Sequence, residues 1–122
     1  MIKHFKDLMA WQESHKLVLS VYKATKLFPA DERFALADQI RRCVVSVTSN
    51  IAEGFGRNSG RDKLQFYAIS RGSLFELESQ LLIARDLDYI SGEIFKNLEC
   101  QINFVSRLIS GIIKTAPTKD VG

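Results

Sequence analysis

Residues 39–54, QIRRCVVSVTSNIAEG, constrain the fold most, because they predict a helix with almost no side suited to water. An apolar stripe recurs at three- and four-residue steps, which is the spacing of one helix face. Small residues cover one flank of the stripe, polar residues cover the other, and no lysine occurs in the segment. A helix covered on several sides lies inside a large fold or between subunits. Because the chain is short, the pattern favours an assembly of identical chains. The stripe consists of Leu36, Ile40, Val44, Val47 and Ile51.

The length of the chain, 122 residues, predicts one domain with one core. No run approaches the roughly 18 apolar residues of a membrane span. The first residues also lack the apolar segment and cleavage site of a signal peptide. We therefore expect a cytoplasmic protein with no membrane partner, in which Cys43 and Cys100 are free thiols rather than a disulfide.

Four segments have helical periodicity, and the residues between them are turn formers. The first helix is predicted to begin after Asp7 as its N-cap and to end near Leu27, before Pro29. The second is predicted over residues 34–55, the third over residues 61–87 after a capping Ser59, and the fourth after Ser91. The predicted buried stripe of the first helix is Leu8, Trp11, His15, Val18 and Tyr22.

Short connections between long helices make sequence neighbours antiparallel. The sequence therefore predicts an all-α fold, an antiparallel up-down-up-down four-helix bundle. Residues 1–115 are expected to form this single domain, and residues 116–122 a disordered C-terminal tail.

Polar residues interrupt or flank the apolar faces of the second and third predicted helices. Burying such groups without partners costs roughly 1–3 kcal/mol each, so we expect them to bond to one another. Arg42 or Arg71 is the expected partner of Glu53 or Glu76. The favoured interpretation is a buried network that fixes helix register; a ligand or catalytic pocket is the alternative. The predicted network comprises Gln39, Arg42, Asn50, Glu53, Ser73, Glu76 and Gln80.

Motifs for metal, nucleotide or hydrolytic chemistry are missing from the sequence. A di-iron bundle needs Glu-x-x-His pairs, and neither His4 nor His15 follows a glutamate by three positions. Cys43 and Cys100 have no paired metal-ligand spacing, and Gly54-Phe55-Gly56 lacks the third glycine of a dinucleotide loop. We expect no catalytic residue, metal or cofactor, and we expect His15 to be partly buried and hydrogen-bonded.

Positive charge gathers in the middle of the chain, around the predicted loop between the second and third helices. The formal charge of the whole chain is +3. Basic side chains beside the start of a helix can receive phosphate, although a basic loop also serves simply for solubility. The predicted nucleic-acid-binding residues are Arg41, Arg57, Arg61, Lys63 and Arg71.

Several short motifs together resemble one family. The chain is similar to the small four-helix-bundle proteins encoded in intervening sequences of bacterial 23S rRNA genes, also labelled S23 ribosomal proteins, over roughly residues 4 to 115. Cys43 stands where that family usually has alanine, and Thr48 where proline is common. The matching segments are Trp11-Gln12, Phe28-Pro29 with Glu32, Gln39-Ile40-Arg41-Arg42, Ser46, Asn50-Ile51-Ala52-Glu53-Gly54, Gly72-Ser73-Leu74 and Glu76-Leu77-Glu78.

The resemblance implies a homopentameric ring and no catalytic residues, while the molecular function of the family is not established. A related accessory protein of diversity-generating retroelements is a basic pentamer thought to engage nucleic acid, which supports RNA or DNA binding by analogy alone. The leading hypothesis is thus a non-enzymatic homo-oligomer that binds nucleic acid. The alternative is a protein-interaction scaffold with no nucleic-acid role.

Overall fold

The computed structural model describes residues 2–116, which form four long helices and two short 3-10 turns. The elements are η1 (Phe5–Asp7), α1 (Met9–Thr25), η2 (Ala30–Glu32), α2 (Leu36–Phe55), α3 (Gly60–Asp86) and α4 (Gly92–Thr115). No strand occurs within this range. The predicted all-α class is confirmed. Of the predicted disordered tail, Ala116 is buried directly after α4, and residues 117–122 lie outside the described residues.

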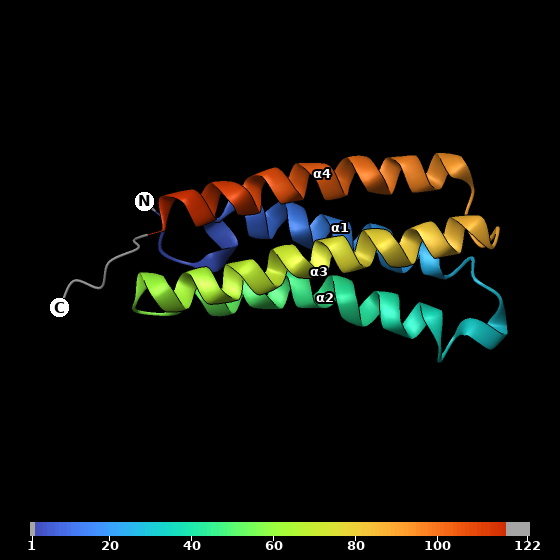
Figure 1. Ribbon diagram of the computed structural model, residues 1–122, viewed down its shortest axis with the longest axis horizontal. Helices are drawn as coiled ribbons and strands as arrows, with labels where there is room; N and C mark the ends of the chain where they lie inside the picture. Colours follow the sequence, from blue (N-terminus) through green and yellow to red (C-terminus); the bar gives the residue numbers. More distant parts are fainter. Residues whose placement is uncertain (1, 117–122) are drawn as a thin grey trace.

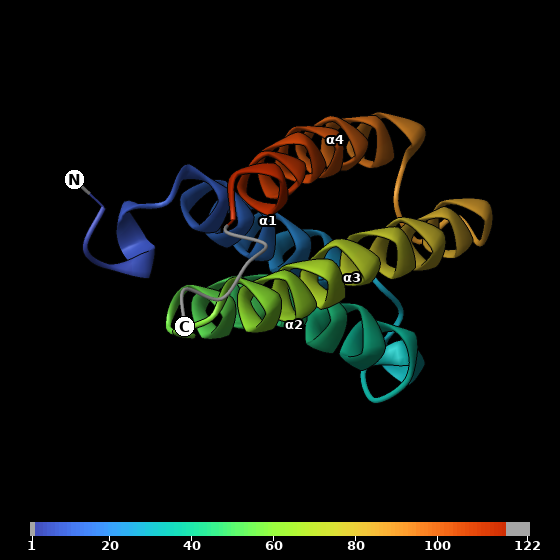
Figure 2. The ribbon, with the colours of Figure 1, turned by 60° about the vertical axis from the view of Figure 1, so that its left-hand side comes forward.

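The four helices alternate in direction along one long axis, as the colour gradient of each ribbon shows (Figure 1). Helices that are adjacent in the sequence contact one another, and α4 closes the bundle against α1. The contact between α2 and α3 is the most extensive, and Figure 2 shows these two helices side by side along their length. The predicted up-down-up-down bundle is therefore the observed architecture.

Serine hydroxyls begin two of the helices, as predicted. Ser59 Oγ accepts a hydrogen bond from the backbone N–H of Asp62 at 3.1 Å, and Ser91 Oγ accepts one from Ile94 at 3.1 Å. The prediction for Asp7 is wrong. Its carboxylate accepts the backbone N–H of His4 at 3.0 Å and so closes η1, whereas α1 begins after Leu8 without a side-chain cap.

The core lies along the bundle axis. The predicted stripe of α2 is confirmed, because Ile40, Val44, Val47 and Ile51 are fully buried and Leu36 is partly buried against them. Against it lie fully buried leucines and isoleucines of the other helices, among them Leu17, Leu74, Leu77, Leu81 and Ile109.

Of the predicted buried stripe of the first helix, Leu8 is buried directly before α1, but within α1 the predicted face is wrong by about one residue. The residues that face the core are Ala10, Ser14, Leu17, Val21 and Ala24, while His15 and Tyr22 are exposed. Small residues at the first two of these positions let α1 approach its neighbours closely. The bulkier Trp11 and Val18 lie at the edge of the core, partly buried.

Candidate nucleic-acid interface

The connection between α2 and α3 is held tightly against α3. Gly54 lies so close to Tyr67 that a Cβ at position 54 would be 2.6 Å from Tyr67 Cε1. Only glycine allows this approach without movement of the neighbouring ring. The contact fixes where the α2–α3 connection, and the basic residues beside it, lie at this end of the bundle.

The ammonium group of Lys63 caps the C-terminal end of α2. Its Nζ donates to the carbonyl oxygens of Phe55 at 2.7 Å and Gly54 at 3.3 Å, and lies 5.3 Å from the centre of the Phe55 ring. A cation at a helix C-terminus satisfies the last carbonyl groups and the negative end of the helix dipole. The ammonium group of Lys63 thus has a structural role in addition to the predicted role in phosphate binding.

Arg57 and Arg61 are the other two predicted cations at this end. Arg57 forms an ion pair with Glu53 at 3.2 Å, and its guanidinium carbon lies 4.5 Å from the centre of the Phe66 ring. Arg61 is exposed, and it forms no ion pair with any residue in the described range. Arg61 is consequently the cation of this end that is least engaged within the chain.

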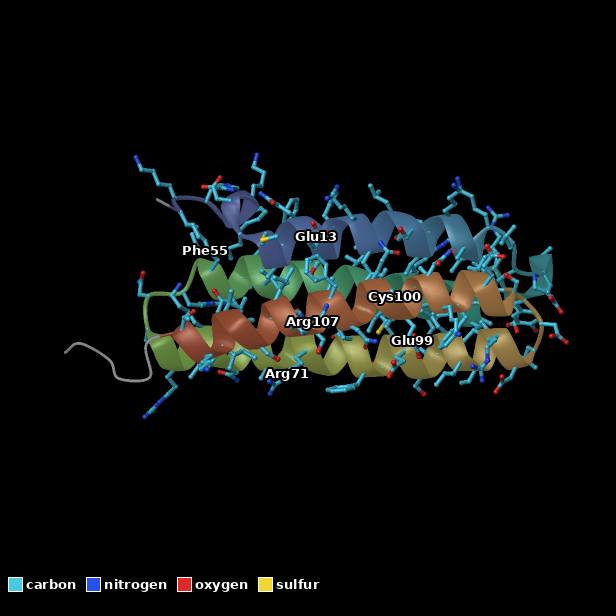
Figure 3. All side chains as sticks on the ribbon, turned by 90° about the horizontal axis from the view of Figure 1, so that it is seen from above. Glu13, Phe55, Arg71, Glu99, Cys100 and Arg107 are labelled. Carbon is cyan, nitrogen blue, oxygen red and sulfur yellow. The ribbon has the colours of Figure 1, made fainter. Side chains whose placement is uncertain are left out.

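Arg41 and Arg71 do not join this group. Arg41 lies near the start of α2, at the opposite end of the bundle, where its Nε donates to Thr25 Oγ1 at 2.8 Å. Arg71 is partly buried along α3, roughly 15 Å from Arg61 at 1.5 Å per residue. Figure 3 shows it beside the middle part of the bundle, whereas Phe55 lies near one end. The structure therefore brings together Arg57, Arg61 and Lys63 alone.

One member of the predicted polar network, Ser73, joins α3 to α2. Ser46 Oγ and Ser73 Oγ share a hydrogen bond of 3.0 Å. Asn50 Nδ2 donates to Ser46 Oγ at 3.0 Å and to the Ser46 carbonyl oxygen at 2.8 Å. The Ser46–Ser73 bond joins the two helices and restrains their register, as the structural interpretation predicted for Ser73, whereas the bonds of Asn50 stay within α2.

Glu76 and Gln80 form a separate pair on α3. Gln80 Nε2 donates to Glu76 Oε1 at 3.3 Å, and the buried Gln80 Oε1 has no hydrogen-bond partner among the described residues. Glu76 itself is exposed.

The other three predicted members, Gln39, Arg42 and Glu53, also lie on the surface, so the prediction of burial is wrong for them and for Glu76. Arg42 pairs with Asp38 at 2.9 Å on its own helix, and Glu53 pairs with Arg57. Neither Arg42 nor Arg71 reaches Glu53 or Glu76 as predicted. The reason is helical geometry: the three surface side chains leave α2 away from its buried stripe.

Sequence reasoning missed two polar contacts between α2 and α3. Ser70 Oγ donates to the Val47 carbonyl oxygen at 2.7 Å, and Cys43 Sγ donates to the Ser73 carbonyl oxygen at 3.1 Å. The spacing of Ser70 and Ser73 on one helix face was a usable signal. Burial, with a smaller effect from Glu76, raises the pKa of the Cys43 thiol to about 12, so this thiol is a packing group rather than a nucleophile. Both cysteines are free, as predicted.

Within residues 2–116, the histidines and the other potential metal ligands do not come together in a site. His15, predicted to be partly buried with a hydrogen bond, is instead exposed and stacks on Trp11 with ring centres 4.9 Å apart. This follows from the rotation of α1, which turns Ser14 toward the core. No group of three potential metal ligands occurs in this range, and none of its helices is long and apolar enough to cross a membrane.

One face of α3 exposes large apolar side chains. Ile69, Phe75, Ile83 and Leu87 are 46%, 66%, 48% and 51% exposed, respectively. Leu87 is the C-cap residue of α3, and helical spacing places all four on the outer side of the helix, with Ala68 and Gly72 among them. We call these six residues the α3 outer face. Exposed polar residues, among them Glu76, Ser79 and Asp86, lie on the same side, so the face is mixed. Its large exposed apolar side chains make it a candidate interaction surface.

The fold and these surfaces define the class of protein: an all-α four-helix bundle with an exposed apolar face and a group of basic residues at one end. The chain matches the family model of the 23S rRNA-intervening sequence protein over residues 6–111. It therefore belongs to that family, as the motifs predicted.

A solved structure has the same fold. It is the crystal structure of a protein with unknown function from the S23 ribosomal protein family of Bacteroides thetaiotaomicron, 22% identical to this chain. The alignment covers 88% of this chain and 100% of that one, with a TM-score of 0.80. No match was found among curated proteins.

Proposed function

We propose that this chain is the non-enzymatic subunit of a homo-oligomeric ring, of five copies by family analogy, that binds the phosphate groups of RNA or DNA. The α3 outer face is the observation that carries the proposal. Leaving four large apolar side chains in water is unfavourable, and burying apolar surface gains about 25 cal/mol per Å². A second copy of the chain, presenting the same helices, would cover this face.

Gly72 adds a second argument for contact between copies. A glycine within a helix costs about 1 kcal/mol relative to alanine. Within the chain nothing requires it, because a Cβ at position 72 would meet no atom within 4 Å. A glycine on an open apolar face suits close approach of another backbone, which is the contact that assembly would make.

Assembly would raise the affinity for phosphate of the basic end, which we define as Arg57, Arg61 and Lys63. Arg61 and the paired Arg57 provide few phosphate contacts in one copy, and exposed contacts of this kind are weakened by salt. In a ring the same cations recur in each subunit, and linked weak contacts add to a much higher overall affinity. The positive charge of each chain, +3, also steers a polyanion toward the assembly.

The test is salt-dependent binding of a labelled single-stranded RNA, measured by fluorescence anisotropy on protein whose mass is determined by light scattering. We expect a multimeric mass and an affinity that falls steeply with salt. Combining Arg57→Gln with Arg61→Gln should flatten the slope of log affinity against log salt, by about 0.7 for each phosphate that the double variant no longer binds. Lys63 is left unchanged because it ends α2.

The matched control combines Lys16→Gln with Lys96→Gln. This pair also removes one ion-paired cation on α1 and, on α4, one cation that forms no ion pair within residues 2–116. It should leave the slope unchanged. Binding that is undetectable or independent of salt, or a protein of single-chain mass, would overturn the proposal.

A protein-interaction scaffold is the second candidate, and one observation favours it. Two of the three cations at the basic end are already engaged, Arg57 with Glu53 and Lys63 with the α2 carbonyl groups. Such a surface could meet an acidic protein instead of nucleic acid. Copurification of a protein partner that survives nuclease treatment, without RNA binding, would select this alternative.

A further inference from the structure

We propose that a groove at the α1–α2 connection binds a nucleotide, with basic residues holding its phosphate and the Phe34 ring beside its base. The groove has a volume of about 440 Å³, within the usual range of small-molecule sites, which is about 300–1,000 Å³. Thr25, Lys26, Arg33 and Arg41 supply its polar lining. It lies at the end of the bundle opposite the α2–α3 connection (Figure 1).

Arg41 is held in place before any ligand arrives. Its Nε donates to Thr25 Oγ1 at 2.8 Å, and its guanidinium carbon lies 5.0 Å from the centre of the Tyr22 ring. The Thr25 hydroxyl in turn donates to the Tyr22 carbonyl oxygen at 3.0 Å. With Nε occupied and the group fixed on a ring, the two terminal nitrogens of Arg41 remain to donate to phosphate oxygens.

The positive charges that line the groove are not neutralised by carboxylates of the described residues. Within residues 2–116, none forms an ion pair with Lys26, Arg33 or Arg41. Glu32 accepts the Tyr89 hydroxyl at 2.7 Å, and Asp38 pairs with Arg42. Asp31 is nearby in η2 but is not part of the lining.

The uncompensated positive charge of the groove suits an anion with several acceptor oxygens. Phosphate has this chemistry, and the planar guanidinium groups of two arginines match it.

Phe34 distinguishes a nucleotide from a simple phosphate. It is 85% exposed, the most of any large apolar side chain described, and the Arg33 guanidinium carbon lies 5.3 Å from the centre of its ring. Arg33 thus links the groove to an exposed aromatic ring. A base stacked on an aromatic side chain gains about 1–3 kcal/mol in nucleic-acid complexes.

This inference does not depend on the proposed function, because the groove shares no residue with the basic group at the α2–α3 end. The experiment titrates the full chain with three probes: inorganic phosphate, ribose 5-phosphate and adenosine monophosphate. Calorimetry measures affinity, and NMR follows the Arg41 Nε–H signal together with the backbone amides of residues 25–41. We expect shifts confined to this region and the highest affinity for adenosine monophosphate.

Variants separate the contributions of the residues. Arg33→Gln leaves the Arg41–Thr25 bond intact and should weaken adenosine monophosphate binding about tenfold, since charge-assisted hydrogen bonds are the strong ones. Arg41→Gln should have at least that effect, and Phe34→Ala should reduce binding to that of ribose 5-phosphate. Should Arg41→Gln fail to fold, Lys26→Gln replaces it, because the Lys26 side chain is exposed and forms no ion pair within residues 2–116.

The matched control is Arg42→Gln, which removes the same charge one residue away, from a side chain that is 80% exposed and outside the groove. It should bind adenosine monophosphate as the unchanged protein does, and so should the variant lacking Arg57 and Arg61. The absence of shifts at millimolar adenosine monophosphate, or equal loss in Arg42→Gln, would overturn the site. Equal binding of ribose 5-phosphate and adenosine monophosphate would overturn its assignment to a nucleotide.

Discussion

At the scale of single residues, the role of a polar side chain depends on partners that lie either close by or far away in the chain. Arg41 and Arg42 are adjacent and carry the same charge, yet Arg41 is anchored to Thr25 while Arg42 pairs with Asp38 on the surface. The capping serines could be predicted because their partners lie three residues away. The Arg41–Thr25 bond could not, because it joins two helices whose rotation the sequence does not specify.

Cys43 gives a prediction at this scale. Its pKa of about 12 keeps the thiol protonated, so iodoacetamide should modify the exposed Cys100 and leave Cys43 unmodified. A denatured sample is the control and should carry two adducts by mass spectrometry. In the unfolded chain Cys43 ionises near its usual pKa, about 8.5. The folding free energy that Cys43 contributes is therefore complete at neutral pH and declines as pH rises above this value. An adduct on Cys43 in the native protein would contradict the prediction that its thiol is protected and protonated.

At the scale of helices, how well the sequence predicts a buried face depends on how unequal the two sides of the helix are. The stripe of α2 was predicted because Ile40, Val44 and Val47 form its largest apolar set. In α1 the bulky Trp11 and Val18 led us to predict that their side of the helix is buried. The buried side instead carries the small Ala10 and Ser14, which allow close packing. The surface positions of Gln39 and Glu53 were missed for a related reason: a residue flanking an apolar stripe can fall on either side of the boundary of burial.

A single substitution on α3, Gly72→Ala, should have opposite effects on the stability of the chain and on its assembly. Gly72→Ala should stabilise a dissociated chain by about 1 kcal/mol through helix propensity, because the added methyl group meets no atom within 4 Å. The same methyl group should hinder contact between copies and raise the dissociation constant of the assembly. Thermal unfolding and light scattering over a dilution series measure the two effects.

Gly111→Ala is the matched control for Gly72→Ala. Gly111 also has open space within the chain, but it lies on α4. The Gly111→Ala variant should be more stable than the unchanged protein, and its assembly should not be weaker. An equal effect of both variants on assembly would argue against contact between copies through the α3 outer face.

At the scale of the whole molecule, the bundle does not need a partner to complete its core. Each helix contributes fully buried residues, among them Leu17, Ile40, Leu77 and Ile109. Assembly through the α3 outer face would then join subunits that are already folded. This separates the free energy of folding from that of association, so a substitution on the outer face can change one without the other.

Phe75→Asp tests that separation. Because Phe75 is 66% exposed, the variant should keep its helical circular dichroism while its mass by light scattering falls to that of one chain, 13.8 kDa. A carboxylate buried between subunits without a partner carries a desolvation cost larger than the apolar contact it replaces. Leu19→Asp is the control, since Leu19 is 59% exposed on α1 and should leave the assembly intact. If Phe75→Asp stays assembled while Leu19→Asp dissociates, the subunits meet through α1, and the open space beside Gly72 needs a different explanation.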